Sequence, residues 1–349
     1  MLKLKSLDLM LSLSAALLVL GSMLMSPAGN VADVATLHTF WLSAGVMGVG
    51  FVLTWQLRLI PAIWFWSVAI ATRLLLLPML PGIDVWRYIW EGYIQTLGFS
   101  PYHFAPNAPE LEPYRTEWWS QIVFPEVSAI YPPMTQLGFR FLATIAPNLY
   151  LFKMSFVLAD LMICWLLSRR FGNGQAALYA WNPLIIYSFA GGVHYDSWFI
   201  LPLVAAWFLI DPPPSSPTAH CPLPTAHLLK SALLLGISVA VKWMSLPMLG
   251  FLVWRSLRQF KLLPAICTGI IGLLPMVLAA LPFCQTGTCP LIPMNSVFVS
   301  YGRSAELIPH FVAQIWQPSL QTNSIYLFPL ALFVLWLTLR ATRFQQFAE

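Results

Sequence analysis

Apolar stretches long enough to cross a lipid bilayer recur along this chain, and they constrain its fold more than any other feature. The hydrocarbon core of a bilayer requires about 20 apolar residues per helix, and bundles tolerate shorter spans. Candidate spans lie near residues 8–25, 37–57, 59–80, 149–168, 175–191, 197–210, 228–243, 245–255, 262–283 and 323–340. The sequence therefore predicts an all-α fold, a polytopic transmembrane helical bundle of about ten spans.

Composition supports this class and excludes others. The 349 residues are 58% hydrophobic and 9% charged, whereas a soluble domain is about 25% charged. The 16 Trp, 23 Phe and 11 Tyr argue against disorder. The net charge of +5 is typical of cytoplasmic loops in a membrane protein and predicts no nucleic-acid partner. The first span follows Lys3 and Lys5 without an A-x-A site, which predicts an uncleaved anchor.

Basic residues set the predicted orientation, because cytoplasmic loops carry an excess of Lys and Arg. With both termini cytoplasmic, that side receives Lys3, Lys5, Arg58, Arg169, Arg170, Lys230, Arg255, Arg258, Lys261, Arg340 and Arg343. The other face receives Arg87, Arg115, Arg140, Lys153, Arg303 and most of the acids. We expect a multi-pass protein of the cell (inner) membrane, in contact with membrane lipids, with the candidate functional residues named below on the external, periplasmic face.

Residues 81–148 form one large external loop in this scheme, and two amphipathic helices are predicted within it. The first has an apolar face of Trp86, Ile89, Trp90, Tyr93 and Leu97 and a polar face of Asp84, Arg87, Tyr88, Glu91 and Gln95. The second, after Tyr131, has an apolar face of Met134, Leu137, Gly138, Phe141 and Ile145. Such helices lie in the membrane interface, although 131–147 could also span the membrane. A proline-rich, ordered loop is expected between them.

Three regions follow from this organisation. Residues 1–58 form an N-terminal two-helix segment, and 59–255 form a membrane core that includes loop 81–148. Residues 256–349 form a C-terminal membrane segment with an external loop at 284–322. Residues 211–227 are a low-complexity linker to which no chemistry is assigned.

Asp84 is the leading catalytic candidate. It follows Pro81-Gly82, where a span ends and an interfacial helix begins. A carboxylate there is either a helix cap or a general base aimed at an acceptor hydroxyl. Arg87 and Tyr88, three and four positions later, share its face and are candidate ligands of a phosphate or a sugar.

A second candidate cluster lies in WNPLIIYSFAGGVHYDSW, residues 181–198. Two short apolar stretches meet at Gly191-Gly192, with His194 and Asp196 at the external turn. Short helices that meet at a polar turn build substrate sites in membrane proteins, but ordinary loop polarity is the alternative. Two ligands do not define a metal site, so a divalent metal is not indicated and no cofactor is assigned.

Cations and cysteines complete the candidates. Lys242 either snorkels to the interface or binds a lipid-linked phosphate, and Arg303 is a second phosphate candidate. Arg73 and Asp160, both within spans, predict a structural ion pair. Cys284 and Cys289 predict a disulfide in an oxidising compartment.

Four motifs in this order resemble a known family. They are LLLLPMLPGIDVWRYIWEGYIQTLGFSPYHFAP, FPEVSAIYPPMTQLGF, WNPLIIYSFAGGVHYD and AVKWMSLP. Together, over roughly residues 59–255, they look like bacterial polyprenyl-phosphate-sugar-dependent glycosyltransferases of the GT-C superfamily. The nearest group is the polyprenyl-phosphate-mannose-dependent α-mannosyltransferases.

The resemblance implies an inverting transfer from a polyprenyl-phosphate sugar, with mannose as the expected sugar, to a lipid- or glycan-linked acceptor. By this resemblance, Asp84 matches the essential loop carboxylate of the family. His194 and Asp196 match its polar turn, and Lys242 matches its later basic residue. Many relatives have paired acids where this chain has Ile83-Asp84, which argues against a two-carboxylate or metal-bridged site. The alternatives are a transporter or flippase of a lipid-linked saccharide, which commonly shows paired repeats, and a structural partner of an envelope complex.

Overall fold

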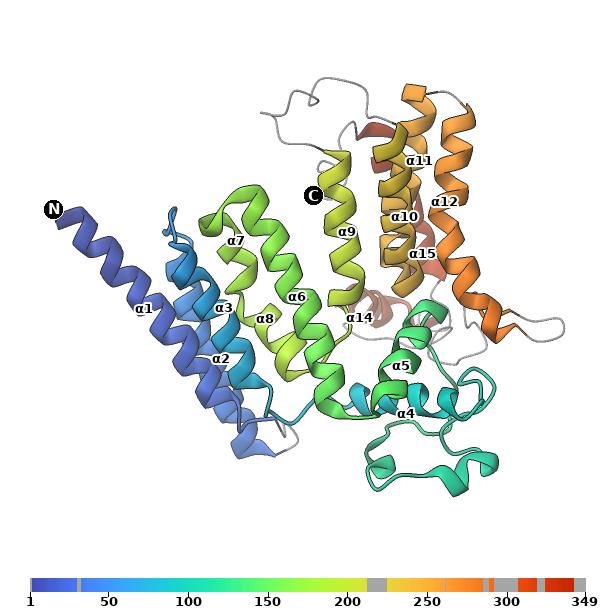
Figure 1. Ribbon diagram of the computed structural model, residues 1–349, viewed down its shortest axis with the longest axis horizontal. Coiled ribbons are helices and arrows are strands. Elements are labelled where there is room, and N and C mark those ends of the chain that lie inside the picture. The colour runs from blue at the N-terminus through green and yellow to red at the C-terminus, as the bar shows by residue number, and fades with distance from the viewer. Residues whose placement is uncertain are drawn as a thin grey trace. The chain divides into compact units, whose positions relative to one another are not determined.

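The computed structural model is helical throughout the residues that it describes. These are residues 2–29, 33–211, 225–260, 262–284, 289–291, 307–318 and 324–341, and no strand occurs among them. The chain divides into two compact units, residues 1–89 with 145–204 and residues 90–144 with 205–349. The helices of both are labelled in Figure 1. The predicted regions 1–58, 59–255 and 256–349 stay a prediction.

The first unit is built on long apolar helices from both of its chain segments. Its helices are α1 (Leu2–Met25), α2 (Val34–Thr54), α3 (Ala62–Leu76), α6 (Leu149–Phe171), α7 (Asn173–Ala180), α8 (Pro183–Ile186) and the π-helix η3 (Tyr187–Gly191). Helix α1 packs on α2 and α3, and α6 packs on α7 and η3. Leu18, Met47, Phe65 and Trp181 are fully buried in this core.

The second unit holds the remaining helices. They are α5 (Pro133–Ile145), α10 (Thr225–Val241), α11 (Leu246–Phe260), α12 (Leu262–Ala280), α14 (Leu307–Ile315), α15 (Ser324–Arg340) and the short 3₁₀ helices η1 (Pro109–Tyr114), η2 (Trp119–Gln121), η4 (Trp243–Ser245) and η5 (Leu281–Phe283). Helix α12 packs on α10 and α11, and α15 packs on α11. Helices α4 (Asp84–Thr96) and α9 (Ser197–Ile210) begin in the first unit and end in the second.

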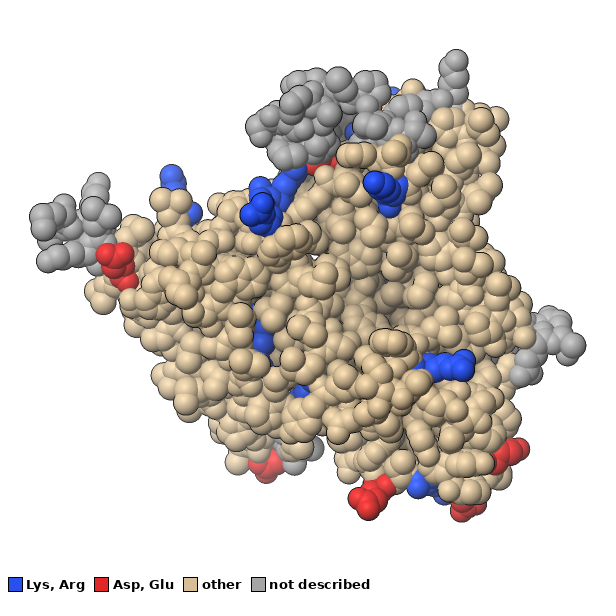
Figure 2. All heavy atoms as spheres, in the orientation of Figure 1, with Lys and Arg blue, Asp and Glu red and all other residues tan. Residues whose placement is uncertain are grey.

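The long helices carry large apolar side chains that are exposed on the surface. Trp41 and Leu42 on α2 and Leu263 and Ile270 on α12 are more than 60% exposed, which is costly in water. Figure 2 shows few charged side chains on the visible face. Four helices, at Leu7–Met25, Val34–Thr54, Leu149–Phe171 and Leu262–Phe283, are long and apolar enough to cross a membrane, and four shorter helices are also apolar. These features indicate a membrane protein, and the predicted total of ten spans stays a prediction.

Helices α4 and α5 occupy the positions of the two predicted amphipathic helices, and most of their polar side chains are buried in the protein. On α5, Thr135 and Gln136 are fully buried, whereas Phe141 and Ile145 are more than 60% exposed. On α4, the polar residues Arg87, Glu91 and Gln95 are at most 4% exposed. That both helices lie in the membrane interface stays a prediction. In an apolar surrounding, the protein interior is where polar side chains find hydrogen-bond partners.

Two other segments differ from expectation. The predicted span 175–191 is interrupted at Trp181 and Asn182, where the Asn182 side chain accepts a hydrogen bond from the Leu184 N–H and starts α8. The predicted external loop 284–322 contains the helix α14. The predicted disulfide between Cys284 and Cys289 is present, and the proline-rich loop is ordered, with Ala129 N–H donating to the Pro101 carbonyl at 2.8 Å.

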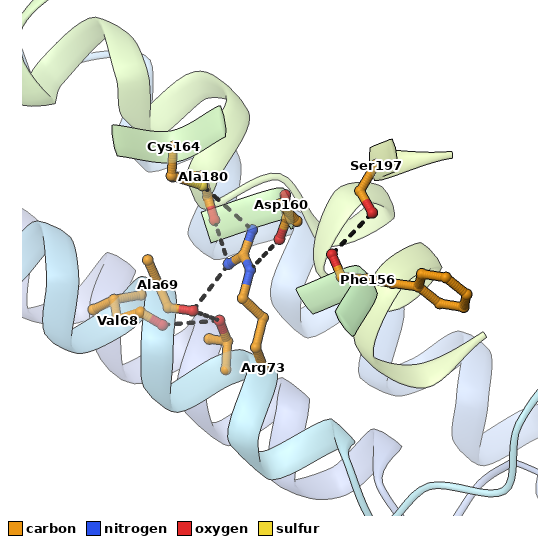
Figure 3. A network of polar contacts seen from close by, with 9 residues as sticks. Val68, Ala69, Arg73, Phe156, Asp160, Cys164, Ala180 and Ser197 are labelled. Carbon is orange, nitrogen blue, oxygen red and sulfur yellow. Dashed lines mark hydrogen bonds and ion pairs between the residues drawn. The ribbon is translucent and has the colours of Figure 1, made fainter. Parts of the chain in front are cut away.

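The predicted ion pair between Arg73 and Asp160 is confirmed in the core of the first unit. Both side chains are fully buried, and Arg73 Nε lies 2.5 Å from Asp160 Oδ2. As Figure 3 shows, the guanidinium also donates to the carbonyls of Ala69 and Ala180 and contacts the Cys164 sulfur. This pairing joins α3 to α6 and to the end of α7.

Candidate active site

A close backbone contact brings together the two segments that carry the leading candidates in the first unit. Gly82 N–H donates to the Gly192 carbonyl at 3.2 Å. A Cβ atom added to Gly82 would lie 2.8 Å from that carbonyl oxygen, so only glycine allows this approach. Asp84 follows two residues after Gly82, and His194 follows two residues after Gly192.

The backbone before His194 is held in an unusual conformation. Residues 187–191 form a π-helix, and Gly192 N–H closes it on the Tyr187 carbonyl at 2.7 Å. Val193 then adopts a φ of 63°, which is strained for a β-branched residue and costs about 1–3 kcal/mol. The His194 N–H donates back to the Ser188 carbonyl. Such π-turns and strained residues cluster at functional sites.

Asp84 is the first residue of α4 and is partly exposed. Among the residues that the structure describes, its carboxylate has no hydrogen-bond or ion-pair partner. It therefore does not accept a backbone N–H as a cap would.

The polar turn after the π-helix carries His194 at its start and Asp196 at its end, and the two residues have different environments. His194 is partly exposed, with its ring against Gly192. Asp196 directly precedes α9, and its carbonyl accepts from the N–H groups of Phe199 and Ile200. Asp196 thus occupies the N-cap position of α9, where Asp is favoured, so the turn supplies a helix start as well as a candidate ligand.

Tyr88 and Arg87 lie on the first turns of α4 and are buried. The Tyr88 ring is 1% exposed and packs edge-to-face on Phe156 of α6 and on Tyr195. It therefore fixes α4 against the turn that carries His194 and Asp196. The Arg87 side chain is 4% exposed. Their predicted roles as ligands of a phosphate or sugar stay predictions.

The remaining candidates belong to later segments of the chain. Lys242 is in the second unit, between α10 and η4, and is partly exposed. Thr135 of α5 donates its hydroxyl to the neighbouring Val241 carbonyl at 2.7 Å, which ties this segment to α5. Arg303 lies outside the described residues.

Two sets of buried polar residues were missed by the sequence analysis. Lys153 of α6 is fully buried, although it was placed with the ordinary basic residues of the external face. In the second unit, Gln136 donates to the Glu91 carboxylate, and Gln95 donates to the Gln136 carbonyl and side chain. The signal in the sequence was a charged or amide side chain within an apolar helix. In a membrane protein such a side chain indicates that it is buried against a polar partner, and not that it is exposed to water.

Metal-ligating side chains do not gather in threes within the described part of the chain. The backbone bond from Gly82 to Gly192 brings together the segments that carry Asp84 and His194, and no described residue engages the Asp84 carboxylate. This arrangement can accept a proton from a bound hydroxyl and hydrogen-bond to a polyol.

Comparison with known proteins identifies the family. Residues 73–258, more than half of the chain, match the family model of the MptA_B family, described as alpha-(1->6)-mannopyranosyltransferase, N-terminal domain. The match includes Asp84, His194, Asp196 and Lys242. No curated protein and no solved structure gives a significant match. The chain therefore belongs to this family of mannosyltransferases and is a glycosyltransferase.

Proposed function

We propose that the protein transfers a mannosyl residue, with inversion, from a polyprenyl-phosphate donor to a lipid- or glycan-linked acceptor at the external face of the membrane. Asp84 is the general base of this reaction. The observation that carries the proposal is the unengaged Asp84 carboxylate, held beside the His194 turn by the contact between Gly82 and Gly192.

The reaction balances without an additional reactant. The acceptor hydroxyl oxygen forms a bond to the anomeric carbon, and the bond from that carbon to the phosphate oxygen breaks. The proton of the hydroxyl passes to the Asp84 carboxylate, and polyprenyl phosphate leaves with the electron pair. An inverting step that makes an α linkage, as the family description specifies, starts from a β-linked donor.

Other residues receive proposed roles from their chemistry. His194 and Asp196 bind hydroxyl groups of the donor or acceptor, because imidazole and carboxylate both hydrogen-bond to sugars. Lys242 binds the donor phosphate as a point charge, with Arg87 or Arg303 as further phosphate ligands. Tyr88 keeps α4 in register with the turn through its contact with Tyr195.

The external location follows from the charge distribution. With cytoplasmic termini, the positive-inside rule places Asp84, His194, Asp196 and Lys242 on the same external side. A polyprenyl-linked donor is anchored in the bilayer, so a site at the membrane surface meets its substrate without extracting the chain from lipid.

The experiment that tests this function uses the purified protein in detergent or proteoliposomes with synthetic β-linked polyprenyl-phosphate mannose and a mannoside acceptor. The expected result is release of polyprenyl phosphate in equal amount to an α-linked mannosylated product, identified by mass spectrometry and α-mannosidase digestion. A transporter or flippase would move the intact donor between leaflets without releasing polyprenyl phosphate. Equal turnover with a nucleotide-linked mannose would contradict the proposed donor.

A further inference from the structure

Lys153 is a buried cation that the chemistry described above does not use. It lies in the second turn of α6, and its side chain is fully buried. Its ammonium donates to the Leu77 carbonyl at 2.9 Å and to the Met79 carbonyl at 2.6 Å. No carboxylate of the described residues forms an ion pair with it. A buried charge without a counter-charge is costly, so this position calls for a specific role.

The two carbonyls belong to the segment that leads to Asp84. Helix α3 ends at Leu76, and Leu77 and Met79 lie in the turn that joins it to α4. Met79 is 2% exposed, so its carbonyl has little access to water. Lys153 therefore fixes the backbone five residues before Asp84, and the bond from Gly82 to Gly192 fixes it two residues before Asp84.

The same turn of α6 also holds the segment that follows the His194 turn. Trp198 donates its indole N–H to the Ser155 hydroxyl at 3.0 Å. Ser197 donates its hydroxyl to the Phe156 carbonyl at 2.9 Å, as Figure 3 shows. Residues 153–156 thus anchor both segments whose side chains form the candidate site.

We infer that Lys153 is a positioning residue for catalysis: it sets the place of the Asp84 carboxylate relative to the His194 turn. This inference rests on the proposed function, in which Asp84 is the base. A general base acts only within hydrogen-bond reach of the proton that it removes, so the backbone anchor of Asp84 controls the rate. The competing explanation is a cation that only caps the carbonyls at the end of α3 and stabilises the fold.

The test replaces Lys153 by methionine, which keeps the stem and removes the three N–H donors. Because a misplacement of about 1 Å at a reacting group costs on the order of 100-fold, we expect kcat per folded enzyme to fall by about 100-fold. The KM for the donor should change by less than about twofold, since donor binding is not affected. Lys153→Arg should recover part of kcat, because it retains the charge and the donors.

The matched control is Ser14→Ala, because the Ser14 hydroxyl is also fully buried and donates to a carbonyl, that of Gly50, at 2.7 Å between α1 and α2. It removes a buried bond from a side chain to a carbonyl in the same unit, away from the α3–α4 turn. We expect a lower melting temperature with unchanged kcat. If Lys153→Met accumulates poorly, Lys153→Gln keeps an N–H donor for one carbonyl and should show the same selective loss of kcat, reduced in size.

A double-mutant cycle with Asp84→Asn separates positioning from stability. If Lys153 acts through Asp84, adding Lys153→Met to Asp84→Asn leaves the residual rate unchanged, because the group being positioned is already lost. A Lys153→Met enzyme with wild-type kcat, or an additive loss in the double variant, would overturn the inference while Asp84→Asn alone still supports the base. Full activity of Asp84→Asn would overturn both.

Discussion

Two aspartates of the first unit, Asp160 and Asp84, have contrasting environments. Asp160 is fully buried and is bound to Arg73, whose guanidinium also reaches two carbonyls. Asp84 is partly exposed at the start of α4, and no described residue engages its carboxylate. A substrate cannot reach the Asp160 carboxylate, whereas the Asp84 side chain is partly accessible.

Under the proposed function, the difference separates a structural charge, that of Asp160, from a catalytic one, that of Asp84. A buried ion pair with its hydrogen bonds satisfied holds helices in register, and neither partner is available for proton transfer. An unengaged carboxylate next to a strained turn keeps its capacity to accept a proton. The same contrast predicts which property, stability or rate, each substitution affects.

The largest expected effect on stability is that of Asp160→Asn. It leaves the Arg73 charge buried without its counter-charge, which costs about 3–5 kcal/mol. Thermal unfolding in detergent should show this loss, whereas kcat of the folded fraction should stay close to wild type.

The control for this variant is Asp8→Asn, because Asp8 is exposed on α1 and a surface substitution changes stability by less than about 0.5 kcal/mol. Replacing both partners, as Arg73→Met with Asp160→Leu, should recover most of the lost stability. If the single variant melts like the wild type, the ion pair does not hold α3 to α6.

Lys242→Met extends the comparison of structural and functional charges to a cation that we propose binds the donor phosphate. Charge-assisted contacts are worth about 1.5–3 kcal/mol, so donor affinity should fall by roughly 10- to 150-fold. Lys242→Arg should recover part of it. Binding is measured in an Asp84→Asn background, which blocks turnover. The control is Lys230→Met, because Lys230 is exposed on α10, the helix that directly precedes Lys242. Equal affinity in all variants would leave Lys242 with a purely structural role.

Gly82→Ala should disturb the candidate site through its backbone. The added Cβ meets the Gly192 carbonyl oxygen at 2.8 Å, so the two segments must separate, and we expect kcat to fall by about tenfold. Gly48→Ala is the matched control: it has no atom within 4 Å of the new Cβ and lies within α2, where Ala is favoured by about 0.5–1 kcal/mol. Equal kcat in both variants would show that the contact does not position the site.

The smallest effect on activity is expected from reduction of the disulfide between Cys284 and Cys289. Cys284 and Cys289 should resist thiol labelling until a reductant is added, and should then react with a membrane-impermeant reagent from outside the cell. Labelling only from the cytoplasmic side would reverse the proposed orientation, and with it the placement of Asp84 at the external face.

The helical class and several particular contacts were predictable from the sequence. Apolar length predicted α1, α2, α6 and α12, because a bilayer sets that length. An arginine and an aspartate within spans predicted the ion pair between Arg73 and Asp160, because neither charge is stable alone in an apolar core.

Which face of α5 is buried was not predictable from periodicity alone. A helix with one polar and one apolar side has the same sequence pattern whether water or protein covers the polar side. In the structure, Gln136 is buried against α4, while Phe141 is exposed. The positive φ of Val193 and the contact between Gly82 and Gly192 depend on tertiary packing. Lys153 was missed because its partners are backbone carbonyls, which no sequence motif marks.

The rate of Asp84→Asn, measured together with its stability, tests the central claim most directly. Asn keeps the shape and loses the basic carboxylate, so transfer from polyprenyl-phosphate mannose should fall by about 10²- to 10⁴-fold, with an unchanged melting temperature because the carboxylate holds no structural partner. A variant that retains more than about a tenth of the wild-type rate, against the loss of at least 10² expected for a general base, would contradict the account.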